Sequence, residues 1–262
     1  MFDVHYHLLF GVDDGPQTID DSVALAEASI AEGVTHVVAT PHASLRYPFQ
    51  PEINHERLET IQRRFEGRLT LALGCDFHLS YDNLVDLEQE PSRYTVNGKQ
   101  YLLVEFAEFL IPRSLSVVLF RLRNTGIVPV ITHPERNPAL IADPQRLDEL
   151  IGIGCLLQVT AGSLCGDFGR KAESMSLDLV RRNLVDLVAS DAHSQKWRPP
   201  SMRRAYDLLH SRFGQTTADR LCLHNPRAVF FGEQLPPQPE TSDVPVRRRS
   251  RAGGLFSRLT GK

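Results

Sequence analysis

The first sixteen residues, MFDVHYHLLFGVDDGP, place several metal-binding side chains close together. His5 and His7 stand two positions apart in a run with the composition of a strand, so both side chains point to the same side of it. Asp13 and Asp14 follow in the next turn. Neutral imidazoles and carboxylates suit divalent ions such as Mn²⁺, Zn²⁺ and Fe²⁺. The segment therefore predicts part of a metal site.

Similar side chains follow most of the other apolar runs that predict strands. They are His42, Asp76, Glu105, His133, Asp191 and His193. In an α/β barrel the carboxyl ends of the strands form one face, where active sites are built. Histidines and carboxylates mixed without cysteine favour catalysis over a structural zinc site. These candidates exceed the needs of one ion, and metal ions about 3.5–4 Å apart suit the hydrolysis of phosphate esters.

Two arginines indicate what the site binds. Arg136 follows His133 by three residues, and Arg198 follows His193 by five. Planar guanidinium groups match the oxygens of a phosphate, although each arginine taken alone could equally form a surface ion pair. The remaining histidines are assigned no role. They are His36, His55, His78, His210 and His224. His78 is the doubtful case, because it follows Asp76 by two residues.

Short apolar runs alternate with amphipathic stretches along most of the chain. The expected strands are 2–6, 35–40, 69–74, 101–105, 127–132, 155–160 and 185–190, and the expected helices lie within 20–33, 51–67, 113–126, 143–154 and 199–214. Each of these helical stretches ends at a glycine. Seven strand-then-helix units predict an α/β fold with a closed or nearly closed parallel barrel. Asn97-Gly98 predicts a tight hairpin leading into the strand at 101–105.

Composition bounds the function and the domain organisation. The 262 residues, 42% hydrophobic and 23% charged, suffice for one core, and a net charge of −3 argues against a nucleic-acid binder. The chain opens on a strand instead of a signal peptide, and no apolar run approaches the ~20 residues of a membrane span. Four scattered cysteines without a CxxC pair fit a cytoplasmic protein.

A change of composition predicts a boundary near residue 233. Residues 1–233 form the expected catalytic domain, and 234–262 are rich in proline and then in arginine, with little to bury. We expect this tail to be disordered. It is either a solvated appendage or a weak anchor whose arginine cluster touches an anionic membrane surface or an acidic partner.

Several motifs together resemble a known family. DVHYHLLFGVDDGP, VVATPH, VEF, PVITHPER and SDAHS with the later RPPSM resemble the PHP (polymerase and histidinol phosphatase) superfamily, over residues 2–232. Within it they resemble the metal-dependent tyrosine-protein phosphatases of capsule and exopolysaccharide biosynthesis. The resemblance implies a distorted TIM-like barrel of seven strand-helix units with three divalent ions. Manganese is the first choice, and zinc, iron and magnesium are the alternatives.

The resemblance also implies roles for individual residues. One ion would be held by His5, His7, Asp76 and Asp191, a second by Asp76, Glu105 and His133, and a third by Asp14, His42 and His193. Arg136 and Arg198 would bind the phosphate. One departure concerns the bridging Asp76, where the family commonly has glutamate; the shorter side chain bears on metal spacing and metal preference.

The expected reaction is direct hydrolysis of phosphotyrosine, without a phosphoenzyme. Water activated between the metal ions would attack phosphorus, both arginines would neutralise the phosphate oxygens, and His42 or His193 would assist departure of the tyrosine. In the family the substrate is the phosphotyrosine tail of a bacterial tyrosine autokinase that controls polysaccharide export. The enzyme class implied is a phosphoric monoester hydrolase of the protein-tyrosine-phosphatase type.

Three other functions are alternatives to this one. A thiol phosphatase needs an arginine six residues after its cysteine, and none of the four cysteines has one. A PHP-type phosphoesterase acting on a small molecule such as histidinol phosphate would use the same metal chemistry. A non-catalytic regulator that keeps its metals for structure is the third reading.

Overall fold

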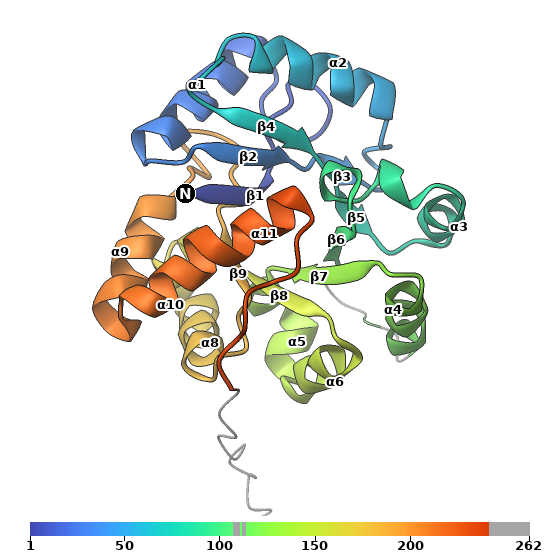
Figure 1. Ribbon diagram of the computed structural model, residues 1–262, viewed down its shortest axis with the longest axis vertical. Helices are drawn as coiled ribbons and strands as arrows, with labels where there is room; N and C mark the ends of the chain where they lie inside the picture. The colour runs from blue at the N-terminus through green and yellow to red at the C-terminus, as the bar shows by residue number, and fades with distance from the viewer. Residues whose placement is uncertain (107–110, 112–113, 241–262) are drawn as a thin grey trace, which may run out of the picture.

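The computed structural model describes residues 1–106, 111 and 114–240, and its strands are all paired in parallel (Figure 1). The strands are β1 (Phe2–Tyr6), β2 (His36–Ala39), β3 (His42–Ala43), β4 (Thr70–Leu73), β5 (Asp76–His78), β6 (Tyr101–Glu105), β7 (Val128–Thr132), β8 (Leu156–Thr160) and β9 (Leu187–Ala189). They are short and rich in valine and leucine, as parallel strands buried on both faces are. The seven strands expected from the sequence are confirmed, each within two residues at either end.

Two of the expected strands are interrupted. β2 continues into β3 after Thr40-Pro41, and β4 continues into β5 after Gly74-Cys75, so the ladder divides into a β1-β2-β4 sheet and a β3-β5-β6-β7-β8-β9 sheet. Backbone bonds from Gly74 N to Ala39 O (2.9 Å) and from Asp76 N to Pro41 O (3.1 Å) carry the pairing across the break. Pro41 has no N–H to donate, which accounts for the local loss of the regular ladder.

The last strand returns to the first. Tyr6 and Ala192 form a parallel bridge, Asp191 N donates to His5 O (2.9 Å), and His7 N donates to Ala192 O (3.0 Å). The strands therefore follow one another around a ring in chain order. This arrangement agrees with the predicted TIM-like α/β barrel of seven strand-helix units.

Helices cover the outside of the ring (Figure 1). They are α1 (Ile19–Ala31), α2 (Pro51–Gln62), α3 (Tyr81–Gln89), α4 (Leu115–Asn124), α5 (Pro138–Ala142), α6 (Gln145–Ile153), α7 (Ala161–Leu164), α8 (Gly169–Arg181), α9 (Met202–Phe213), α10 (Gln215–Asp219) and α11 (Asn225–Phe231), with short 3₁₀ or π turns η1 (Pro91–Arg93), η2 (Val96–Gly98), η3 (Pro134–Arg136) and η4 (Arg220–His224). The predicted stops at Gly33 and Gly154 are left-handed (φ 84° and 91°), a conformation that glycine adopts without strain. Within the described residues, no helix combines the length and the apolar character needed to cross a membrane.

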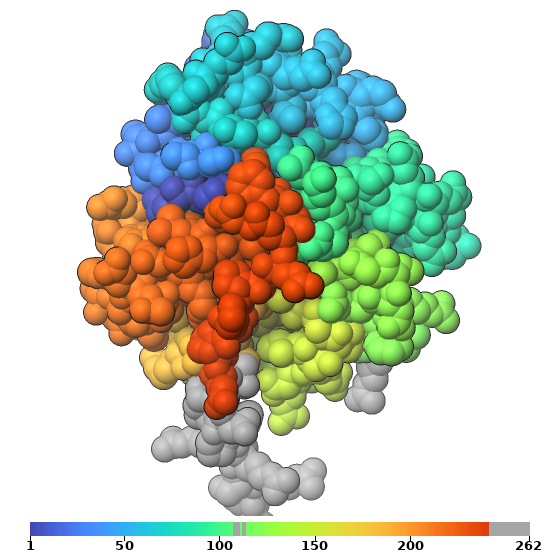
Figure 2. Space-filling view, in the orientation of Figure 1, coloured from blue at the N-terminus to red at the C-terminus, as the bar shows by residue number. Residues whose placement is uncertain are grey.

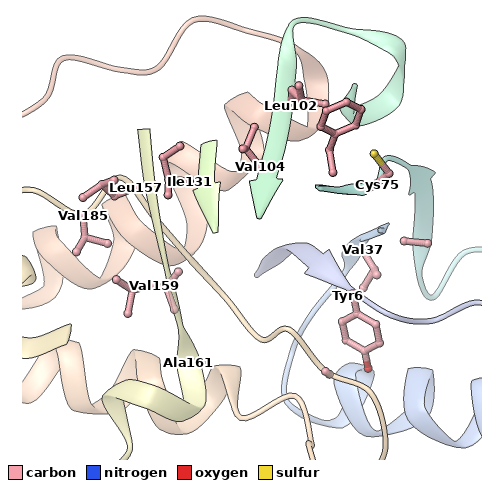
Figure 3. Packing of buried hydrophobic residues seen from close by; sticks show 14 of the residues in the cluster. Tyr6, Val37, Cys75, Leu102, Val104, Ile131, Leu157, Val159, Ala161 and Val185 are labelled. Carbon is pink, nitrogen blue, oxygen red and sulfur yellow. The ribbon is translucent and has the colours of Figure 1, made fainter. Parts of the chain in front are cut away.

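Two apolar clusters hold the barrel together. The larger one lies between strands and outer helices and includes Val37, Leu102, Ile131 and Leu157 (Figure 3). Each fully buried aliphatic side chain of this kind contributes about 1.5–3 kcal/mol. The smaller cluster fills the barrel interior and contains Val4, Val38, Ala72, Val96, Tyr101, Leu103, Val130, Leu187, Ala189, Val229 and Phe230.

Helix α11 closes the amino-terminal end of the barrel. It crosses the ring in Figures 1 and 2, and its Val229 and Phe230 belong to the interior cluster. The hairpin predicted at Asn97-Gly98 is wrong: the turn exists, with Asn97 at φ 52°, but no strand precedes it in the described residues 89–100. Instead Val96 is buried in the interior cluster and Asn97 Nδ2 donates to Phe230 O (3.2 Å). Packing against α11 replaces the expected strand pairing.

The predicted tail begins inside the described residues. Leu235 packs against the interior cluster, and Gln238 accepts a hydrogen bond from Arg220 and exchanges hydrogen bonds with Asn225. The arginine cluster at 247–251 lies outside the described residues, so both the domain boundary at 233 and the expected disorder stay predictions.

Candidate metal centre

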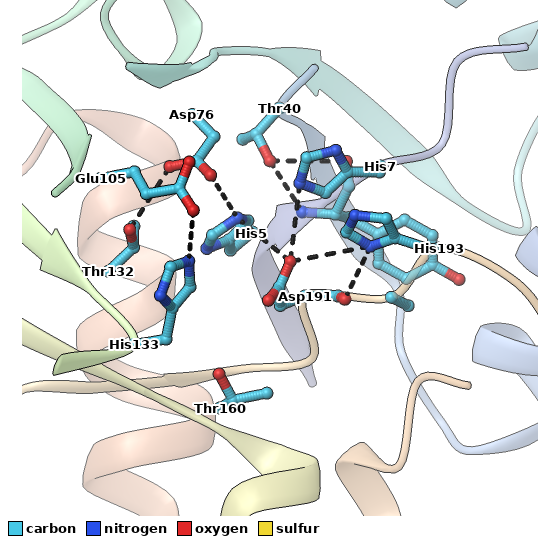
Figure 4. A network of polar contacts seen from close by, with 12 residues as sticks. His5, His7, Thr40, Asp76, Glu105, Thr132, His133, Thr160, Asp191 and His193 are labelled. Atoms are coloured by element: carbon cyan, nitrogen blue, oxygen red, sulfur yellow. Dashed lines mark hydrogen bonds and ion pairs between the residues drawn. The ribbon is translucent and has the colours of Figure 1, made fainter. Parts of the chain in front are cut away.

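A ring of histidines and carboxylates lies at the carboxyl ends of the strands (Figure 4). All nine side chains predicted as metal ligands fall into groups whose potential ligand atoms lie within 4.8 Å of one another. The groups are His7, Asp14, His42 and His193; His5, His7 and Asp76; His5, His133 and Asp191; His42, His78 and Glu105; and Asp76, Glu105 and His133. Overlap between the groups makes them one continuous cluster, whose ligand roles remain predictions.

β1 reaches this cluster through a change of register. The pairing shifts between Asp3 and Tyr6, so β1 carries one more residue than β2 over that stretch. Such a bulge re-aims the side chains that follow it. Val4 joins the interior apolar cluster while the next residue, His5, faces the barrel mouth.

The deepest part of the cluster surrounds His5. Its Nε2 lies 3.5 Å from Asp76 Oδ2 and 3.4 Å from Asp191 Oδ1, and His7 Nε2 lies 3.5 Å from the same Asp191 oxygen. These four residues, which the family resemblance assigns to one ion, are buried. His133 Nε2 lies 3.5 Å from Glu105 Oε1 on the neighbouring side.

The outer part of the cluster surrounds Asp14. Its Oδ1 lies 3.4 Å from His42 Nε2 and 3.3 Å from His193 Nε2. The rings of His193 and His7 stack at 3.8 Å and connect this group to the deeper one. Asp14 is half exposed (47% of its side chain), so this group faces the solvent.

Unpartnered polar atoms test whether metal ions fit here. Several buried atoms in the cluster have no hydrogen-bond partner, and most of them are the atoms that face one another. They are His5 Nε2, His7 Nε2, His42 Nδ1, Asp76 Oδ2, Glu105 Oε2 and Asp191 Oδ1. An unpaired buried polar atom is costly. Imidazole nitrogens and carboxylate oxygens aimed at a common point are the donor set of divalent metal ions, so the residues present fit such ions.

The second ring nitrogens of three histidines are bound to the protein. His5 Nδ1 pairs with Gln158 Oε1 (2.8 Å), His7 Nδ1 with Asp13 Oδ2 (2.7 Å) and His193 Nδ1 with Asp191 O (3.0 Å). Partners of this kind fix the ring orientation and the tautomer of metal-binding histidines. Gln158 is not among the predicted site residues, although a polar residue inside the apolar run CLLQVT was a signal for it.

The electrostatics of the cluster require positive charge. Burial would lower the pKa of His5, but the Asp191 and Asp76 carboxylates raise it to about 9. Burial would raise the pKa of Asp76, but His5 holds it well below its usual range. Burial and then the Asp76 charge raise the pKa of Glu105. Without metal, a proton on His5 supplies the charge that a cation would otherwise provide.

Two residues of the site have strained backbones. His133 has φ 35° and Asp191 has φ 54°, although neither is glycine. A left-handed residue of this kind costs on the order of 1–3 kcal/mol and is typically found at functional sites. Both follow the ends of strands, where the turn directs their side chains into the barrel mouth.

Both predicted phosphate arginines lie at the mouth. Arg136 Nη1 and Arg198 Nη2 donate to Asp191 Oδ2, and Arg198 Nη1 lies 3.1 Å from His193 Nε2. Phe168 is not among the predicted site residues. The centroid of its ring lies 4.3 Å from Cζ of Arg136 and 5.8 Å from Cζ of Arg198. The arginines are therefore held next to the cluster, with their side chains about one fifth exposed.

A hollow of about 610 Å³ opens beside the cluster. Its lining includes Asp14, His193 and Arg198 from the site, and also Lys196 and Trp197. Trp197 is 91% exposed, which is unusual for the single tryptophan of the chain. The hollow gives a ligand larger than phosphate access to the site.

Most of the histidines left without a role lie elsewhere. His36 stacks on Phe2 near α11, and His55, His210 and His224 belong to α2, α9 and η4. His78 is the exception, because its Nε2 contacts Glu105 Oε2. From the sequence, His78 is assigned no role but is marked as the doubtful case, because it follows Asp76 by two residues; the structure places it beside the cluster.

The cysteines do not form a nucleophilic site. Cys75, Cys155 and Cys222 are buried, and burial raises the pKa of each thiol. Burial also raises the pKa of the partly buried Cys165. A nucleophilic thiol needs the opposite shift.

The chain is similar in sequence to a family of capsular polysaccharide synthesis and to proteins described as tyrosine-protein phosphatases. The family model for capsular polysaccharide synthesis, CpsB/CapC, matches residues 1–231. The tyrosine-protein phosphatase CpsB of Streptococcus pneumoniae is 33% identical over 244 residues, covering 90% of this chain and 100% of that protein. The tyrosine-protein phosphatase YwqE of Bacillus subtilis is 32% identical over 263 residues, covering 97% and 99%.

The fold is also similar to that of solved structures. A structure from the work on YwqE and CpsB, described as unique metal-dependent tyrosine phosphatases, superposes with a TM-score of 0.85 at 30% identity, covering 92% of this chain and 99% of that one. The phosphotriesterase homology protein of Escherichia coli has a TM-score of 0.58 at 14% identity, covering 87% and 98%, and shares the fold alone.

Proposed function

Because the chain belongs to the CpsB/CapC family of capsular polysaccharide synthesis, we propose that it is a metal-dependent protein-tyrosine phosphatase, a phosphoric monoester hydrolase. The observation that carries this proposal is the ring of unpartnered imidazole and carboxylate atoms with two arginines fixed beside it. Metal ligands without arginines would fit many hydrolases; the arginines favour a phosphate ester.

We assign the metal ligands as three sets, of which the first two share Asp76. His5, His7, Asp76 and Asp191 hold one ion, Asp76, Glu105 and His133 a second, and Asp14, His42 and His193 a third. We propose manganese as the metal. When bound, the ions would activate water and stabilise charge on the phosphate oxygens.

Arg136 and Arg198 bind and orient the phosphate in this proposal. Asp191 Oδ2 accepts from both guanidinium groups and Phe168 lies close to both, so their orientation is set before the substrate arrives. Phosphoryl transfer passes through a loose transition state, for which positioning and charge supply most of the catalysis. The ordinary tyrosine pKa is about 10, so departure of the tyrosine oxygen needs modest help; His42 and His193 are the candidates for it.

The proposed substrate is a phosphotyrosine segment of a bacterial tyrosine kinase in polysaccharide export. The hollow beside Trp197 supports a peptide substrate because it extends the site beyond the phosphate. We place the protein in the cytoplasm, where such a kinase tail would be found. Contact of the arginines at 247–251 with an anionic membrane surface is a further part of the proposal.

The test combines elemental analysis with a phosphotyrosine-peptide assay. We expect bound divalent metal, loss of hydrolysis on chelation, recovery with Mn²⁺ and little effect of thiol alkylation. Full hydrolysis by protein shown to be metal-free would contradict the proposal.

A small-molecule phosphoesterase is the competing enzyme reading. A panel of phosphotyrosine peptide, histidinol phosphate and a nucleotide separates the two, and the proposal expects the highest kcat/KM for the peptide. A preference for histidinol phosphate would overturn the assigned substrate while leaving the metal chemistry intact.

A non-catalytic regulator is the remaining reading. For His5→Ala and Asp191→Asn we expect loss of turnover while binding to the kinase segment survives. A native protein with neither bound metal nor hydrolysis would favour the regulator.

A further inference from the structure

His78 is placed beside the metal ligands by strand pairing. It follows Asp76 by two residues in β5, so both side chains point to the same side of the strand. The parallel register pairs His78 directly with Glu105 of β6. Neighbouring strands lie about 4.8 Å apart, which brings paired side chains into contact.

The contact leaves ligand atoms facing one another. His78 Nε2 contacts Glu105 Oε2, and His42 Nδ1 lies 3.6 Å from the same oxygen. His42 Nδ1 is buried and has no hydrogen-bond partner, while the buried Glu105 Oε2 is in contact with His78. The three side chains have ligand atoms within 4.8 Å of one another, as the assigned ligand sets have.

The neighbouring ligand set is short of donors. Asp76, Glu105 and His133 supply three side chains. Asp76 Oδ1 already accepts from Thr132 Oγ1 (3.3 Å), and Asp76 Oδ2 also faces His5 and His42. His78 shares a group with Glu105 and His42, and not with Asp76 or His133, so an ion held by His78 lies on the His42 side of Glu105.

We propose that His78 is a tenth metal ligand of this chain, which with Glu105 and His42 binds a first-row divalent ion at the outer edge of the cluster. The inference rests on the proposed metal centre. The His78 side chain is 35% exposed and that of Glu105 19%, whereas His5 and Asp76 are buried. The ion that His78 helps to hold therefore lies nearer to solvent than the ion held by His5 and Asp76, and exchanges more readily than that ion.

Three variants test this role in the full chain loaded with Mn²⁺. His78→Phe keeps a ring but removes both nitrogens. His78→Gln keeps a side-chain N–H that can donate to Glu105 but lacks the imidazole. His55→Phe is the matched control, because His55 is an exposed histidine on α2 outside every metal-binding group.

The measurements are metal content by elemental analysis and the rate at which a chelator removes each equivalent of metal. For His78→Phe and His78→Gln we expect loss of one equivalent, or its removal about 10-fold faster or more, with the other equivalents unchanged. The spectrum of the Co²⁺-loaded protein should change in the same two variants and not in His55→Phe.

Two results would overturn the assignment. Metal content and release rates like those of the control would remove His78 from the ligands, and normal values for His78→Gln alone would reduce it to a hydrogen-bonding partner of Glu105. A wild-type protein that binds no metal would instead refute the proposed function. Thermal unfolding of each variant checks folding, and should the Phe ring prevent folding, His78→Gln carries the test.

Discussion

Gln158 shows how one neutral side chain can control a charged site. Its Oε1 is paired with His5 Nδ1 at 2.8 Å inside the barrel, which leaves His5 Nε2 to face Asp76 and Asp191. An acceptor at Nδ1 selects the tautomer whose Nε2 can bind a metal ion. His5 thus owes its orientation to Gln158 of β8, a residue 153 positions away in the chain.

We expect Gln158→Leu to weaken metal binding about 10- to 100-fold, because the His5 ring loses its orienting acceptor. Gln158→Glu keeps an acceptor of similar size and should bind metal more nearly as the wild type does. Competition with a calibrated chelator measures both. Equal affinity of the Leu variant and the wild type would show that His5 is oriented by its other contacts.

At the scale of elements, two loops complete the site above the strands. The loop after β1 carries Asp13 and Asp14, and Gly15 N donates to Asp13 Oδ1 (2.9 Å) while Asp13 supports His7. The segment after β9 is tied back by a bridge between Ser194 and Arg198. Each loop thus contributes residues in fixed positions that the strands cannot reach.

Gly15→Ala should disrupt the first loop. A Cβ at this position would lie 2.7 Å from the backbone oxygen of His7, which cannot move without moving the strand end. We expect loss of one metal equivalent and at least a ~10-fold loss of phosphatase activity. Gly152→Ala in α6 is the control, since nothing lies within 4 Å of its Cβ, and it should gain up to about 1 kcal/mol of stability. Unchanged metal content in Gly15→Ala would contradict this account.

The second loop should distinguish peptide from small substrates. Trp197 is next to Arg198 and projects into solvent beside the hollow. Trp197→Ala should raise KM for a phosphotyrosine peptide about 10-fold, a cost typical of one lost aromatic contact, and leave hydrolysis of a small aryl phosphate unchanged. Phe120→Ala on α4, also an exposed aromatic, is the control. An equal effect on both substrates would refute a role in peptide binding.

At the scale of the whole molecule, buried carboxylates in different places have pKa values shifted in opposite directions. At the carboxyl end, His5 and the arginines keep Asp76 and Asp191 ionised. At the amino end, which α11 closes, burial raises the pKa of Asp3 to about 7 despite hydrogen bonds from Ser190 and His5.

Asp3 should therefore make stability depend on pH. The pKa of Asp3 is higher in the folded state than in the unfolded state. Its contribution to the free energy of unfolding is therefore complete below about pH 4 and is lost as the pH rises through about 7. The neutral isostere Asp3→Asn should gain stability relative to the wild type between pH 5 and 8, by up to ~4 kcal/mol. Denaturant unfolding of both proteins with Mn²⁺ present measures the difference. A difference that does not change with pH would show that Asp3 does not titrate in this range.

The strands were predictable because their signal is local. Runs such as THVVAT and YLLVE have adjacent buried apolar residues, Val37–Ala39 and Tyr101–Val104, which mark them as strands buried on both faces. The hairpin at Asn97-Gly98 was not predictable as a turn packed against α11, because the partner that decided it, Phe230, lies 133 residues away.

The sequence by itself determined which side chains stand at the ends of which strands, and hence the donor types of the site. Residue type and two-residue periodicity are properties of neighbours in the chain. Only the tertiary structure decided that β1 changes register before His5, that Gln158 orients this histidine, and that His78 lies beside Glu105. These depend on the registers between strands, and a register is set by packing between segments far apart in sequence.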